Sequence, residues 1–154
     1  LIARMANEGH EIGNHSYSHS DFTTMSYGDI EYEVDLTDEL IMDITGVRPR
    51  LIRTPYGSVN STVRSAVGKP IILWNGDSRD WETRSASAVE SYLLNYAEDG
   101  DILLFHDSHG TTVEGVLDAL PTLVARGFTF VTVSDLFRLR GYSLSSGSVY
   151  YSAP

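Results

Sequence analysis

Two short runs of apolar residues constrain the fold of this chain most strongly. Ile71–Trp74 and Ile102–Phe105 each contain four consecutive apolar residues, and a polar loop follows each run. Uninterrupted apolar runs of this length are typical of strands that are buried on both faces of a sheet. We therefore expect a sheet whose central strands are covered by other parts of the chain.

The segments between these runs carry helix signals. Serine or asparagine stands where a helix would begin, at Ser26, Asn60, Ser85 and Ser134, and glycine often follows where it would end. The pattern predicts an initial helix and then five strands that alternate with helices, with strands at 10–13, 51–53, 71–74, 102–105 and 128–133. Strands joined by crossover helices form a parallel sheet, so we predict an α/β fold, either an open sheet or part of a barrel.

Composition excludes several classes of partner and site. The formal net charge of −10 argues against a nucleic-acid partner, which would favour a basic face. The chain has no cysteine, so a metal ion would have to be held by histidine and carboxylate. No apolar run approaches the length of a membrane span.

Residues whose side chains could bind a metal or take part in catalysis follow four of the five predicted strands. His15 and His19 are spaced so that both rings can face one side of a helical turn and reach one metal ion. The other groups are Arg53 and Tyr56, then Asp77, Asp80 and Trp81, then His106. The carboxyl ends of parallel strands share one edge, so we expect these groups to converge in a metal-assisted hydrolase. Taken singly, each also has a plain structural interpretation, such as a solvated loop histidine or a core tryptophan.

Four ordered motifs resemble those of the polysaccharide deacetylase family, the NodB-homology domain of carbohydrate esterase family 4. They are His15-Ser16-Tyr17-Ser18-His19, Arg53-Thr54-Pro55-Tyr56-Gly57, Asp77-Ser78-Arg79-Asp80-Trp81 and Leu104-Phe105-His106. The segment Val149–Ser152 also resembles the end of Gram-positive peptidoglycan N-acetylglucosamine deacetylases. The family's first motif, an Asp-Asp pair, is absent from the chain.

This resemblance implies a distorted (β/α) barrel, of which the chain would be the C-terminal five-strand portion with the N-terminal strands missing. Residues 1–140 would form an incomplete catalytic domain, and residues 141–154 a C-terminal tail packed on it or extending from it. We expect the missing Asp-Asp pair to lie in an upstream segment of the same protein that acts as a partner. That pair would supply the third metal ligand and the general base.

The resemblance also assigns roles to single residues. His15 and His19 would hold a divalent metal, zinc first and cobalt as an alternative. The backbone N–H of Tyr56 would stabilise the oxyanion, and His106 would be the general acid. Asp80 would orient His106 and Arg53 would tether the absent base, while Trp81 and Leu104 would wall the acetyl pocket.

The expected substrate is a polysaccharide, first of all the N-acetylglucosamine of peptidoglycan, outside a bacterial cell or in its wall. Chitin and O-acetylated xylan are alternatives, because the same site can hydrolyse an amide or an ester. A glycan-binding module without turnover is a competing class, favoured by the missing aspartates. A cytosolic amidohydrolase acting on a small molecule is a third interpretation.

Overall fold

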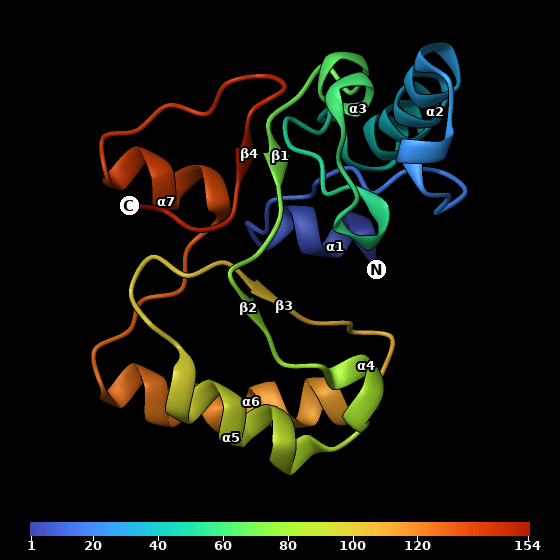
Figure 1. Cartoon of the computed structure of the whole chain (residues 1–154). Coiled ribbons are helices and arrows are strands. Elements are labelled where there is room, and N and C mark those ends of the chain that lie inside the picture. Colours follow the sequence, from blue (N-terminus) through green and yellow to red (C-terminus); the bar gives the residue numbers. More distant parts are fainter. The chain divides into compact units, whose positions relative to one another are not determined.

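The computed structural model describes residues 1–154, which divide into two compact units. The first unit contains residues 1–73 and 132–150, and the second contains residues 74–131 and 151–154. Each unit is therefore built from two separate stretches of the chain, as the colours of Figure 1 show.

The first unit carries a row of short parallel pairings. Its elements are α1 (Ile2–Asn7), η1 (Phe22–Thr24), α2 (Tyr27–Thr45), η2 (Pro55–Gly57), α3 (Ser61–Ala66), β1 (Ile71–Ile72), α7 (Val133–Leu139) and β4 (Val149–Tyr150). Strands β1 and β4 are parallel, and single parallel bridges join Asn14 to Ile52 and Ile52 to Ile71. Four segments far apart in sequence thus lie side by side, and the loops that leave them carry His15 and Arg53.

Helix α2 has clear signals at both ends. The Ser26 hydroxyl accepts a hydrogen bond from the backbone N–H of Asp29 and donates one to the Asp29 carboxylate. Gly46 ends the helix with φ of 74°, a left-handed conformation that favours glycine. The helix contributes Ile30 and Val34 to the buried core of the first unit.

The second unit contains a pair of strands and a pair of long helices. Its elements are β2 (Gly76–Asp77), α4 (Asp80–Thr83), α5 (Ala86–Tyr96), β3 (Leu103–Leu104) and α6 (Gly110–Ala125). Strands β2 and β3 are parallel, with Gly76 opposite Leu103. Helices α5 and α6 lie side by side, and their facing residues form a buried cluster of Val89, Leu93, Ala119 and Leu123 (Figure 1).

The predicted helices are present, although Thr132 and not Ser134 caps α7 and helix α4 was not predicted. The prediction of five strands is wrong. The structure has four strands of two residues each, in two-stranded sheets, and a barrel is not shown. Residues 10–13 and 128–133 form no strand, and Ile52 makes only isolated bridges. Apolar patterning does not report strand pairing, and in residues 128–133 it does not report burial either, because Phe130 and Val131 are exposed. The segment expected to be a tail contributes β4, which pairs with β1.

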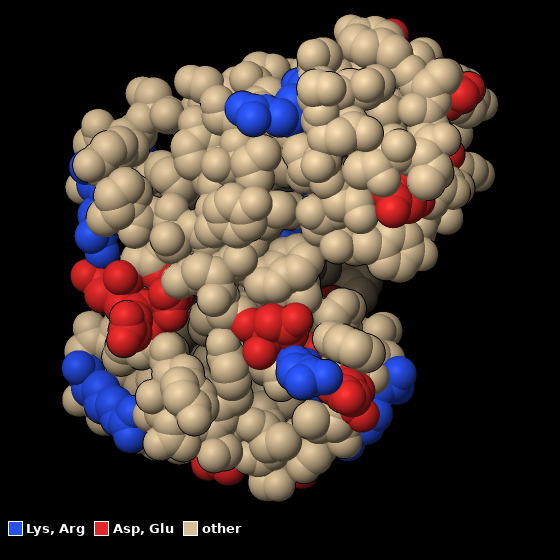
Figure 2. All heavy atoms as spheres, viewed as in Figure 1, with Lys and Arg blue, Asp and Glu red and all other residues tan.

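The helices include no membrane span, and the face drawn in Figure 2 has no basic patch. No helix is both long enough and apolar enough to cross a bilayer. Figure 2 shows acidic and basic side chains in scattered groups, with no continuous basic patch on the face in view.

Candidate active-site residues

The two predicted metal ligands lie in a loop of residues 15–19, which we call the histidine loop. The ring centroids of His15 and His19 are 5.0 Å apart, with an angle of 77° between the ring planes. The loop is not the helical turn that the spacing suggested, because Ser16 and His19 have φ of 66° and 59°. Two left-handed residues bend the backbone and bring the rings together by another route.

One contact determines which nitrogen of His15 is protonated. Its Nδ1 lies 2.7 Å from the backbone oxygen of Arg53. A carbonyl oxygen only accepts, so Nδ1 carries the proton and donates it, which leaves Nε2 as the nitrogen able to coordinate a cation. Metal-binding histidines commonly make such a contact through the second ring nitrogen.

The imidazoles of His15 and His19 are suitable as two of the ligands of a divalent cation. Imidazole suits zinc and cobalt, and the orientation of His15 by a carbonyl is what such a site requires. The structure contains no group of three or more His, Asp or Glu side chains that could hold a metal ion. A third ligand is therefore not provided by this chain next to the two histidines.

Arg53 and Tyr56 lie beside the histidine loop in the first unit. Arg53 donates from Nε to the oxygen of Ile72 at 3.1 Å and from Nη2 to the oxygen of Leu73 at 3.2 Å. Burial lowers the pKa of its guanidinium below the ordinary value. The structure thus anchors Arg53 on the end of β1, while its role in tethering a base stays a prediction.

Tyr56 occupies a strained position in η2. Its φ and ψ are 59° and 5°, an uncommon conformation for a residue with a side chain. The turn's backbone hydrogen bonds are donated by the amides of Gly57 and Ser58, and none of them uses the amide of Tyr56. The tyrosine ring lies 4.8 Å from the ring of His19, centroid to centroid, so the side chain of Tyr56 is a neighbour of a predicted metal ligand.

The predicted acid, His106, is fixed by Asp80 in the second unit. Asp80 Oδ1 lies 2.9 Å from His106 Nδ1, and Asp80 Oδ2 accepts from the His106 backbone N–H at 2.6 Å. The hydroxyl of Thr112, at the start of α6, also donates to Oδ2 at 2.9 Å. A carboxylate only accepts, so His106 Nδ1 carries a proton and Nε2 is the nitrogen left for chemistry.

Electrostatics keep Asp80 charged although it is only 1% exposed. Burial alone would raise the pKa of this carboxyl. The hydrogen bonds from His106 and Thr112 outweigh burial and hold the pKa of Asp80 below its ordinary value of 3.8.

The predicted pocket walls differ in exposure. Trp81, in the first turn of α4, is 47% exposed, whereas Leu104 at the end of β3 is buried. Asp77 pairs with Leu104 across the two strands and accepts the backbone N–H of Arg79. The assignment of Trp81 and Leu104 to an acetyl pocket stays a prediction.

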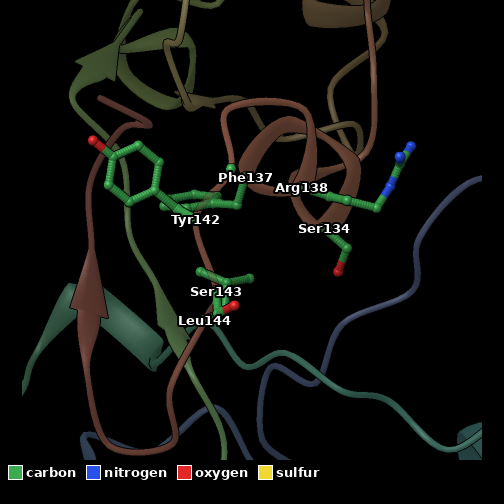
Figure 3. A pocket seen from close by; sticks show the side chains of 7 residues that line it. Ser134, Phe137, Arg138, Tyr142, Ser143 and Leu144 are labelled. Atoms are coloured by element: carbon green, nitrogen blue, oxygen red, sulfur yellow. The ribbon is translucent and has the colours of Figure 1, made fainter.

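The structure brings the predicted residues together within each unit, and the convergence of all four groups at one site stays a prediction. His15, His19, Arg53 and Tyr56 gather in the first unit, and Asp80, Trp81, Leu104 and His106 belong to the second. A shallow hollow of about 400 Å³ beside α7, lined by Phe137 and Tyr142 among others, contains none of these residues (Figure 3).

Sequence reasoning missed several supporting residues. Asn14, Glu33 and Asp38 are buried and hold the histidine loop, and Thr112 holds Asp80. Glu33 and Asp38 could have been found, because they stand three positions after Ile30 and four after Val34, on the apolar stripe of the helix.

Comparison with known proteins identifies the family. An α/β fold with paired imidazoles and a histidine held by aspartate is typical of metal-assisted hydrolases. The polysaccharide deacetylase family profile matches residues 1–69. PgdA of Listeria monocytogenes, a peptidoglycan-N-acetylglucosamine deacetylase, is 37% identical over 98% of this chain and 32% of its own length. The chain spans about a third of that relative.

Two solved structures extend the likeness to three dimensions. The T48 deacetylase with substrate has a TM-score of 0.92 at 35% identity, over 97% of this chain and 74% of that chain. A family 4 acetyl xylan esterase from Clostridium thermocellum, in complex with a cobalt ion, has a TM-score of 0.91 at 33% identity, over 99% and 77%. This chain belongs to the polysaccharide deacetylase family.

Proposed function

We propose that this chain provides the metal-binding histidines and the general acid of a metal-dependent deacetylase that acts on the N-acetylglucosamine of peptidoglycan. The observation that carries the proposal is the contact of His15 Nδ1 with the Arg53 oxygen at 2.7 Å, in a ring whose centroid lies 5.0 Å from that of His19. A solvated histidine needs no such orientation, whereas a metal ligand does.

His15 and His19 would hold the cation, which we propose to be zinc, with cobalt as the alternative. A bound zinc ion supplies Lewis-acid polarisation of the acetyl carbonyl and lowers the pKa of a water molecule. The third ligand and the general base would come from an Asp-Asp pair on another segment, because this chain offers no third side chain beside the histidines. The intact mass of the purified material would show whether such a segment is associated.

The chain's own residues would handle the proton and the acetyl group. His106, held at Nδ1 by Asp80, would act in its doubly protonated form and pass the Nε2 proton to the departing nitrogen, which leaves the neutral ring with its proton on Nδ1. The amide of Tyr56 would donate to the acetyl oxygen, and loss of one such donor costs about 3–4 kcal/mol in comparable sites. Arg53 would tether the base, and Trp81 and Leu104 would border the acetyl group.

The choice of substrate draws support from the relatives. PgdA of Listeria monocytogenes is a peptidoglycan deacetylase, and the Clostridium thermocellum protein is an acetyl xylan esterase. We place peptidoglycan first, because of the likeness to PgdA over nearly the whole chain, and with it an extracellular or wall location in a bacterium. O-acetylated xylan and chitin remain the alternatives that an assay must separate.

The test uses the chain associated with the segment that carries the Asp-Asp pair, with zinc present. It compares acetate release from three glycans: peptidoglycan, N-acetylglucosamine oligomers and acetylated xylan. His106→Ala should lose nearly all acetate release while zinc stays bound, because it removes only the proton donor. His15→Ala should lose the zinc itself, as measured by elemental analysis. Retained turnover in His106→Ala would reject the acid role.

A glycan-binding module without turnover is the second candidate. The observation that favours it is the absence of a third metal-ligating side chain near His15 and His19. It predicts that the chain binds glycan but releases no acetate from any of the three substrates.

A further inference from the structure

The helix behind the histidine loop buries two carboxylates. Glu33 and Asp38 of α2 are 8% and 1% exposed. Buried carboxylates are costly unless they accept hydrogen bonds or pair with cations, so each needs a reason to be there. Both carboxylates accept hydrogen bonds that hold residues 14–18 in place.

Glu33 holds the middle of the histidine loop. Its Oε2 accepts the backbone N–H of Tyr17 at 2.9 Å and that of Ser18 at 2.7 Å. Tyr17 and Ser18 stand between the two histidines. Hydrogen bonds to an ionised carboxylate are stronger than those between neutral groups, so this contact fixes the loop firmly to α2.

Asp38 holds the start of the loop through Asn14. The Asn14 Nδ2 donates to Asp38 Oδ1 at 2.8 Å and to the Val34 oxygen at 2.9 Å. The Asn14 Oδ1 then accepts the backbone N–H of Ser16 at 2.9 Å. On its other oxygen Asp38 is paired with Lys69 Nζ at 2.6 Å, which compensates its buried charge.

Every backbone N–H from residue 16 to residue 19 thus donates to a side chain. The last of the four, that of His19, donates to the Ser16 hydroxyl at 2.8 Å. These contacts explain how Ser16 and His19 keep left-handed conformations that residues with side chains rarely adopt.

We propose that Glu33 is a positioning residue for the metal site, supported by Asp38 through Asn14. It fixes the histidine loop, and so the rings of His15 and His19, before a cation arrives. This inference rests on the proposed metal-binding function of the two histidines. Glu33 itself is not a ligand, since both of its contacts are to backbone amides of the loop.

The test is the zinc affinity of the chain with Glu33→Gln, measured by competition with a chromophoric chelator. Glutamine keeps the size of the side chain but replaces a charged acceptor by a neutral one. Supporting residues of this kind change metal affinity by about 10–100-fold, and we expect a loss in that range. The matched control is Glu39→Gln, an exposed glutamate on the same helix, which should bind zinc as the unchanged chain does.

A purely structural role predicts a different result. In that case Glu33→Gln lowers the melting temperature but leaves the zinc dissociation constant of the folded chain unchanged, which would overturn the proposal. The visible spectrum of bound Co²⁺ gives a second readout, because a displaced histidine alters the coordination geometry. If the unchanged chain binds no zinc, or His15→Ala binds it equally well, the proposed function fails instead.

A measurement on the unchanged chain covers the case in which Glu33→Gln does not fold. Without metal, the amides of Tyr17 and Ser18 should exchange with deuterium much more slowly than the amides of an exposed loop. Fast exchange at both amides would show that the loop is not held in advance and would overturn the proposal.

Discussion

Asp80 shows how single residues in this chain hold a reactive group in place. It accepts hydrogen bonds from the side chain and backbone of His106 and from the hydroxyl of Thr112. His15 is held in a comparable way by the backbone oxygen of Arg53. In both cases the contact is made through Nδ1, so Nε2 is the nitrogen presented for binding or proton transfer.

The lowered pKa of Asp80 predicts a pH dependence of stability. The folded pKa lies below the ordinary value, so the contribution of this carboxylate is complete above 3.8 and is lost as pH falls through the folded pKa. Urea unfolding from about pH 6 to about pH 2 should show this loss. In Asp80→Asn the loss should be smaller, because no proton is taken up at that position.

The control for this prediction is Asp118→Asn, at an exposed position on α6. It should leave the dependence of unfolding free energy on pH unchanged. If Asp80→Asn has the same pH dependence as the unchanged chain, the contacts with His106 and Thr112 do not stabilise the charged carboxylate.

At the scale of elements, the close approach of α5 and α6 depends on Gly115. A Cβ at this position would collide with the backbone oxygen of Ala86 and lie 2.8 Å from the Cβ of Val89. Gly115→Ala should therefore destabilise the fold by about 1–3 kcal/mol, as overpacking does. The measurement is the urea midpoint of the variant against that of the unchanged chain.

Gly28→Ala is the matched control. Gly28 lies in α2, and a Cβ there would meet nothing within 4 Å. Alanine should stabilise this helix by about 0.5–1 kcal/mol, because glycine loses more conformational freedom on folding. An equal effect of the two substitutions would show that helix propensity, and not the contact between α5 and α6, decides the result.

The elements also show what the sequence can predict. Helix caps are local signals, so Ser26, Asn60 and Ser85 marked the starts of α2, α3 and α5 correctly. Strand pairing depends on residues far apart in the sequence, such as Ile71 with Val149, so a local pattern does not predict which strands pair. The support of the histidine loop by Glu33 was missed for the same reason, since its partners lie 15 and 16 positions away.

At the scale of the whole molecule, the four motifs that resemble those of the family are divided between the two units. The motifs predict the site residues because the chemistry of metal binding and proton transfer restricts residue type and spacing. The structure offers no third ligating side chain beside His15 and His19, so the proposed activity requires a ligand from another segment. A divalent cation bound by His15 and His19 is therefore the central claim.

The most direct measurement is an anomalous difference map from crystals of the chain soaked in zinc. The account predicts a peak about 2.0–2.1 Å from the Nε2 atoms of both His15 and His19, the usual zinc–nitrogen distance. A peak elsewhere, or no peak beside these two rings, would contradict it.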